Sequence, residues 1–148
     1  MSEKALPTCE FSSKDLLLRL DVQVAADVNA IGPVVDRVME LAREMKCAAG
    51  KEFEIEMALR EALANAIIHG AKHDSSKVVQ LCVGCDATRG MLIVVRDPGS
   101  GFDPNSVPSP TVGQNVFSEH GRGIFLINQL MDEVRFARGG TEIHMKKS

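Results

Sequence analysis

The sequence lacks any apolar run approaching the roughly 18 residues that a membrane-spanning helix needs. Its first residues, MSEKALPTCEFSSKD, contain no apolar stretch of the signal-peptide type. It also lacks an excess of basic residues, because 17 Lys and Arg are outnumbered by 20 Asp and Glu and the basic residues are scattered. We therefore expect a cytoplasmic protein that neither enters a membrane nor binds nucleic acid directly.

Cysteines are few and mostly far apart. The four are Cys9, Cys47, Cys82 and Cys85, and their spacing suggests no disulfide framework. Cys82 and Cys85 have the spacing of a metal or redox pair. That motif stands alone inside a predicted strand, so we favour plain strand and turn residues, and cytosolic thiols are normally reduced.

The composition is that of one globular domain. The chain has 148 residues, of which 45% are hydrophobic and 25% charged, and this suits a single core. Residues 1–14 are polar and predict a flexible segment. Residues 15–148 then form the domain.

Hydrophobic periodicity predicts three helices and five strands. The expected strands are 16–24, 78–83, 91–96, 133–137 and 141–146, and the expected helices are about 33–47, 53–69 and 123–131. The first helix should bury Val34, Val38, Leu41 and Met45, and Gly70 should end the second. Short connections between strands require antiparallel neighbours. We expect an α+β fold: a two-layer sandwich with a mixed, mainly antiparallel sheet and three helices on one face.

The stretch EALANAIIHG, residues 61–70, places polar groups in an otherwise apolar helix. At about 100° per residue, Asn65 falls near 40° and His69 near 80° from Glu61, so the three share one sector. A buried carboxylate must be matched or functional. Either the group is a satisfied polar network, or Glu61 accepts a proton and Asn65 offers Mg²⁺ an oxygen ligand. His69 and His73 also have ligand spacing, but nothing completes a zinc site, and we favour packing or hydrogen bonding for His69.

Two glycine-rich segments flank a loop of roughly twenty residues, a length typical of functional lids. Asp97-Pro98-Gly99-Ser100-Gly101 follows a predicted strand, where a carboxylate can accept a hydrogen bond from the exocyclic amine of a base. Gly121-Arg122-Gly123 precedes the last predicted helix, whose N–H groups would suit phosphate. An ordinary turn and an ordinary loop-to-helix junction are the alternatives. The loop has the position of a lid over a nucleotide.

Together with Gly139-Gly140-Thr141-Glu142-Ile143, these segments resemble, in order, the motifs of the GHKL ATPases. They look most similar to the small bacterial anti-sigma-factor serine/threonine kinases, over about residues 20–147. The resemblance implies the Bergerat fold, ATP or ADP as ligand and Mg²⁺ as cofactor. It also implies the site residues: Glu61 as general base, Asn65 on Mg²⁺, Asp97, Gly99, Gly101 and Thr141 around adenine, Gly121 and Gly123 beside the phosphates with Arg122 as the nearest positive charge, and His69 where this branch often has histidine.

The same resemblance implies partners. The chain would phosphorylate a serine or threonine of an anti-anti-sigma (STAS-domain) protein and sequester a sigma factor, as a homodimer. Best-known members carry a basic lid residue just before the second glycine segment, where this sequence has Ser118-Glu119-His120. Glu119 favours a nucleotide-binding partner-switching module without kinase activity, whereas Glu61 favours the kinase. A stand-alone histidine-kinase-type ATPase domain is the third hypothesis.

Overall fold

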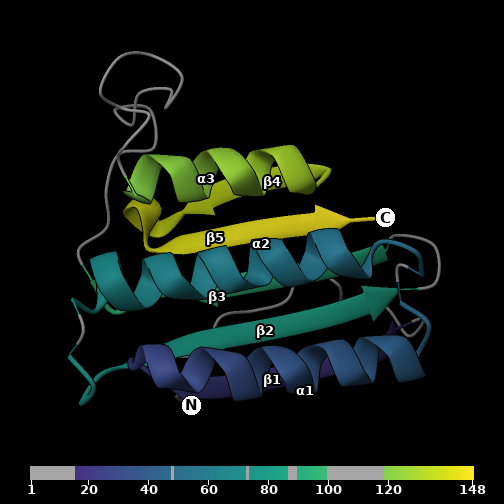
Figure 1. Ribbon diagram of the computed structural model, residues 1–148, viewed down its shortest axis with the longest axis horizontal. Coiled ribbons are helices and arrows are strands. Elements are labelled where there is room, and N and C mark those ends of the chain that lie inside the picture. The colour runs from purple at the N-terminus through teal and green to yellow at the C-terminus, as the bar shows by residue number, and fades with distance from the viewer. Residues whose placement is uncertain (1–15, 48, 73, 87–89, 100–118) are drawn as a thin grey trace.

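Three helices cover one face of a five-stranded sheet in the computed structural model (Figure 1). The structure describes residues 16–47, 49–72, 74–86, 90–99 and 119–148, so the predicted flexible segment 1–14 lies outside it. The strands are β1 (Leu16–Ala25), β2 (Val78–Asp86), β3 (Gly90–Arg96), β4 (Glu133–Ala137) and β5 (Glu142–Lys147), and the helices are α1 (Ile31–Glu44), α2 (Glu52–Asn65) and α3 (Glu119–Leu130). The predicted α+β sandwich is confirmed. No helix in these ranges has the length and apolarity needed to cross a bilayer.

The sheet has the strand order β1-β2-β3-β5-β4. Each neighbouring pair is antiparallel, so the described strands form no mixed sheet of the kind expected. The reason is that the chain leaves β3, passes through α3 to the sheet edge at β4, and returns as β5 beside β3. This return path places the turn between β4 and β5 at the same end of the sheet as the end of β3, where Arg96 pairs with Glu142.

The face of α1 that packs on the sheet differs from the expected one. The buried residues of α1 are Val35, Val38, Met39 and Ala42, whereas Met45 is 41% exposed. The helix carries two adjacent apolar stripes, and periodicity alone does not select between them. Contact with the strands does, so of the expected set only Val38 is fully buried.

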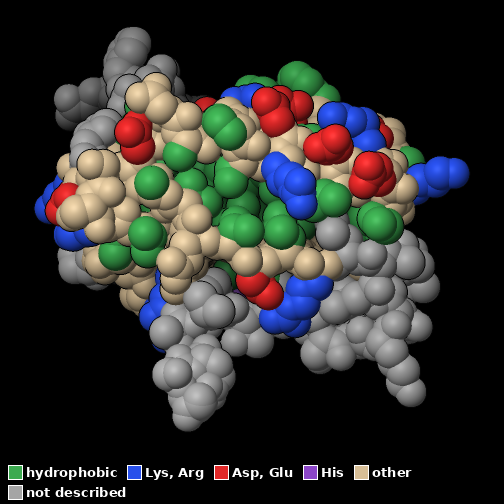
Figure 2. Space-filling view, turned by 90° about the horizontal axis from the view of Figure 1, so that it is seen from below, with side chains coloured by type: hydrophobic (Ala, Val, Ile, Leu, Met, Phe, Trp, Pro, Cys, Tyr) green, Lys and Arg blue, Asp and Glu red, His purple; other side chains and the backbone are tan. Residues whose placement is uncertain are grey.

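The other stripe of α1 reaches the surface beside β1. Seen from below, hydrophobic side chains gather in the middle of this face, with charged side chains around them (Figure 2). The partly buried apolar residues of the two elements include Leu20, Val22, Ile31 and Val34, which pack against the main core. The second apolar stripe of α1 therefore extends the core to the edge of the sheet at β1.

A disulfide joins Cys47, just after α1, to Cys85 near the end of β2. Both cysteines are buried, and Cys82 is disulfide-bonded as well. The expectation of no disulfide framework was wrong because the two residues are 38 positions apart in sequence and meet only once α1 has packed on the sheet. Cys82 and Cys85 therefore do not act together as a metal or redox pair, since Cys85 bonds Cys47.

We expect the Cys47→Ala/Cys85→Ala variant to lose about 3–4 kcal/mol of unfolding free energy, the loop-entropy value for a closed loop of this length. Urea unfolding followed by circular dichroism, with and without reductant, measures it. Any change in unfolding free energy that reductant still causes in the double variant comes from the other cysteines. Identical unfolding midpoints for the oxidised wild type and the variant would contradict the assignment, as would free thiols at both positions in peptide mapping without reductant.

Candidate active site

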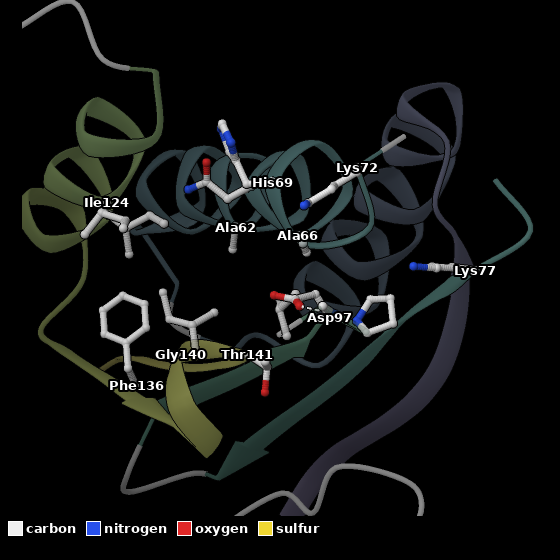
Figure 3. A pocket seen from close by; sticks show the side chains of 17 residues that line it. Ala62, Ala66, His69, Lys72, Lys77, Asp97, Ile124, Phe136, Gly140 and Thr141 are labelled. Carbon is white, nitrogen blue, oxygen red and sulfur yellow. Dashed lines mark hydrogen bonds between the residues drawn. The ribbon is translucent and has the colours of Figure 1, made fainter. Parts of the chain in front are cut away.

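A cavity of about 480 Å³ opens between the helices and one end of the sheet (Figure 3). Its walls come from α2 and the turn after it, the end of β3, α3, and the turn between β4 and β5. Five of the sequence-predicted site residues line it: Asn65, His69, Asp97, Gly99 and Thr141. The fold thus brings together residues from three separate segments of the chain.

The C-terminal end of α2 carries the first of these residues. After Asn65 the helix widens into a π turn over Ala66–Gly70, in which the Ala71 N–H donates to the Ala66 carbonyl at 2.8 Å. Such turns occur often at functional sites. Because a π turn holds more residues than an α turn, His69 does not follow the regular helical step used to place it from the sequence. It still lies on the cavity wall, in the same turn as Gly70.

Gly70 is needed for space rather than for a left-handed helix end. Its φ is not positive, so the expected helix-stop role is not what the structure shows. A Cβ on Gly70 would collide with the carboxyl group of Asp97, and a Cβ on Gly99 would lie 2.5 Å from the Gly70 carbonyl oxygen. The two glycines therefore let the end of α2 and the segment after β3 touch directly.

Asp97 is held in place by the backbone around it. Its N–H donates to the Thr141 carbonyl at 2.8 Å, and its Oδ1 accepts from the Gly99 N–H at 2.7 Å. Burial raises the pKa of the Asp97 carboxyl above its ordinary value, and the Gly99 hydrogen bond partly opposes this. A desolvated carboxylate facing a cavity gains from any ligand that donates a hydrogen bond to it.

Glu61 and Asn65 meet the first turns of α3. A Cβ on Gly123 would lie 2.9 Å from Asn65 Nδ2 and 3.0 Å from Glu61 Oε1. Asn65 lines the cavity, whereas Glu61, one helical turn earlier, is not part of its wall and lies where α2 meets α3. The acid and the amide predicted to act together are therefore neighbours at the α3 side of the cavity.

The second glycine segment lies inside a helix rather than before one. Gly121, Arg122 and Gly123 belong to the first turns of α3, which begins at Glu119 instead of at the expected residue 123. Glycines weaken helices, which is why the sequence favours a loop there; packing against α2 overrides this preference. The side chains of Glu119 and Arg122 lie outside what the structure describes. His73 also lies outside it, and so do residues 100–118, which include Gly101 and the predicted lid.

Two lysines at the cavity were missed from the sequence. Lys72 and Lys77 line its wall, and both are exposed. Figure 3 shows their ammonium groups directed toward the cavity from the segment that follows the π turn. Among the described lining residues, Asp97 is the one acidic group beside these two cations, so the cavity suits a ligand with anionic groups. Lys72 lies two residues after EALANAIIHG, and this proximity was the available signal for it, whereas Lys77 lies just before β2.

The donor set fits a magnesium ion that arrives with a phosphate ligand. Within the described ranges, no group of three His, Cys, Asp or Glu residues could hold a metal ion. Mg²⁺ commonly takes only one or two protein ligands and completes its shell with phosphate oxygens and water. The Asn65 amide oxygen at the cavity wall is a suitable single ligand.

Comparison with known proteins agrees with this geometry. The sequence matches the family described as histidine kinase-like ATPase domain over residues 24–147. The chain belongs to this family. Among similar relatives of this histidine kinase-like ATPase domain, "Serine-protein kinase RsbW" of Bacillus subtilis is 29% identical over 86% of this chain and 84% of its own. "Anti-sigma F factor" of Priestia megaterium is 28% identical, over 85% and 80% of the two chains.

The contact at Gly123 gives a sharp test. In Gly123→Ala, the new Cβ would crowd Nδ2 of Asn65 and Oε1 of Glu61, so these two side-chain ends must turn away from their present positions. We expect ADP affinity to fall about 5- to 20-fold, equivalent to about 1–2 kcal/mol of overpacking, in a titration of the purified domain. Gly32→Ala in α1 is the matched control because nothing lies within 4 Å of its Cβ. Equal ADP affinities for the two variants would contradict the packing described here.

Proposed function

We propose that this chain is an ATP-dependent protein serine/threonine kinase of the anti-sigma-factor type. It phosphorylates an anti-anti-sigma STAS-domain partner and sequesters a sigma factor. One observation carries the proposal: a single cavity in a histidine kinase-like ATPase domain has Asp97 and Thr141 at one wall and Asn65, beside Glu61, at another. The relatives' names, serine-protein kinase and anti-sigma F factor, support the choice of this branch of the family.

In this proposal, one end of the cavity binds the adenine base and the other binds the phosphates. The Asp97 carboxylate accepts a hydrogen bond from the adenine amine, and Thr141 contributes directly or through water. Gly99 and Gly101 let the backbone approach the base closely. Lys72 and Lys77 attract the anionic nucleotide to the cavity mouth.

At the other end, Gly121 and Gly123 free the first turn of α3 to approach the phosphates, where its N–H groups and helix dipole favour negative charge. Arg122 adds a positive charge there. His69 contacts the nucleotide from the π turn.

Proton transfer is assigned to Glu61. The carboxylate takes the proton of the attacking serine or threonine hydroxyl as the oxygen bonds to the γ-phosphorus and the bond to ADP breaks. Asn65 would bind Mg²⁺, which neutralises phosphate charge when bound. Since phosphoryl transfer relies on positioning and charge stabilisation, the α2–α3 contact at Gly123 sets the geometry that Glu61 needs.

We further propose that the protein acts in the cytoplasm as a homodimer, with residues 15–148 as its one domain. The thiols of Cys47 and Cys85 would meet a reducing environment there, so the disulfide would form on oxidation. The module without kinase activity is the competing hypothesis, and it is favoured only by Glu119, the first residue of α3.

Incubation with γ-labelled ATP, Mg²⁺ and an anti-anti-sigma STAS-domain protein tests the proposal. We expect label on a serine or threonine of the STAS protein, and none when either protein is left out. ADP binding without any transfer would support the partner-switching module instead. Absence of both binding and transfer would overturn the proposed function.

A further inference from the structure

A buried carboxylate lies directly behind one wall of the cavity. Glu142 begins β5 and is only 6% exposed. Its neighbours in the strand, Thr141 and Ile143, line the cavity. Because side chains alternate along a strand, Glu142 lies on the opposite face of the sheet, away from the helices.

Two side chains, those of His144 and Arg138, contact this carboxylate. Glu142 Oε1 lies 2.9 Å from His144 Nε2, and its Oε2 lies 3.1 Å from Arg138 Nε. A buried carboxylate is costly unless it is paired in this way. The Arg138 contact is the more informative one, because Arg138 belongs to the turn that leads into the cavity wall.

The backbone of that turn is strained and needs anchors. Arg138 has a φ of 54°, in the left-handed region, followed by Gly139 at 68° and Gly140 at 90°. A residue with a Cβ is strained in this conformation, because its Cβ approaches the following carbonyl oxygen. The Arg138 carbonyl accepts hydrogen bonds from Thr141 Oγ1 at 2.9 Å and Thr141 N at 3.3 Å. Together with the side-chain bond to Glu142, these contacts fix the turn at both ends.

The turn connects Glu142 to the proposed adenine site. Gly140 and Thr141 are cavity wall, and the Thr141 carbonyl accepts from the Asp97 N–H at 2.8 Å. We propose that Glu142, with Arg138 and His144, is a positioning cluster that holds the Arg138–Thr141 turn in place and so sets the affinity of the cavity for adenine nucleotides. This inference rests on the proposed function.

The cluster touches neither Glu61 nor Asn65, so its loss should change binding and not the transfer step. In Glu142→Gln and Arg138→Ala we expect the Kd for ADP and the KM for ATP to rise together, about 5- to 10-fold, as for one lost hydrogen bond of ordinary strength, because the Arg138 side chain is half exposed to solvent. The kcat at saturating ATP should stay unchanged. Arg138→Gly should weaken binding less than Arg138→Ala, because glycine adopts the left-handed conformation without strain.

Calorimetric titration with ADP and phosphotransfer kinetics on these variants test the cluster. Glu133→Gln is the matched control, since its carboxylate meets Lys146 at 3.8 Å on the same strand pair but is 72% exposed. If Glu142→Gln does not fold, the two Arg138 variants carry the test, as that side chain is 55% exposed. Wild-type affinity in both Glu142→Gln and Arg138→Ala would overturn the inference, as would a fall in kcat with KM unchanged. A wild type that does not bind ADP would overturn the proposed function as well.

Discussion

Replacing Glu61 with glutamine is expected to slow phosphoryl transfer to the STAS-domain protein by about 10²- to 10⁴-fold, the usual contribution of a general base. Glutamine keeps the shape of the side chain beside Gly123 but cannot take the hydroxyl proton. ADP affinity should stay within about twofold, because Glu61 is not part of the cavity wall. Single-turnover transfer of labelled phosphate, together with calorimetric titration of ADP, separates the two effects.

Glu56→Gln on the same helix is the control for this experiment. Glu56 meets Arg60 at 3.1 Å in a surface i,i+4 pair, and such pairs contribute only about 0.3–0.5 kcal/mol, so transfer should be unchanged. A Glu61→Gln variant that transfers phosphate at the wild-type rate would remove Glu61 as the base. A variant that loses ADP binding as well would instead place Glu61 among the groups that hold the nucleotide.

Local patterns were enough to predict the elements and to single out several residues that line the cavity. The spacing of Glu61 and Asn65 follows from helical periodicity, and Asp97 with Gly99 follows from a strand running into a glycine turn. Each of these signals depends only on residues that are close together in the sequence. Thr141 was implied by the family resemblance alone, and strand pairing brings it to the same cavity as Asn65 and Asp97.

Features that depend on contacts between distant segments could not be predicted. The space requirement at Gly70 exists only because Asp97 lies against it, and the Cys47–Cys85 bond exists only because the packing of α1 on the sheet brings the chain after this helix to β2. The choice of the buried stripe on α1 has the same origin. The Arg138–Glu142 contact is local in sequence, but it requires the left-handed backbone of the turn between β4 and β5, and the burial of Glu142 depends on the assembled sheet.

Asp97→Asn is expected to have two effects of opposite sign. Nucleotide affinity should fall about 10- to 100-fold, because a charge-assisted hydrogen bond to the adenine amine is worth about 1.5–3 kcal/mol. The melting temperature of the free protein at pH 7 should rise, because the variant no longer buries a charge. Thermal melts and ADP titrations from pH 4.5 to 8 measure both effects, with GDP as the comparison ligand for base selectivity.

The sign of the stability effect follows from linkage. The pKa of Asp97 is raised in the folded state, so the folded protein holds that proton more tightly than the unfolded chain does. The resulting destabilisation is absent below the unfolded pKa, grows as the pH rises through the folded pKa, and is complete above it. The gain in melting temperature of Asp97→Asn should therefore shrink as the pH falls toward 4.5. Wild-type ADP affinity should weaken over the same range, as the acceptor becomes protonated.

Asp74 supplies a control with the opposite sign. Hydrogen bonds from the Ser76 hydroxyl and N–H lower the pKa of the Asp74 carboxyl. Asp74→Asn should therefore lower the melting temperature at pH 7, lose that difference in acid, and leave ADP affinity unchanged. If Asp97→Asn were destabilised in the same direction as Asp74→Asn, or bound ADP as tightly as the wild type, Asp97 would be a structural hydrogen-bonding group of the turn after β3 and not the residue that binds the base.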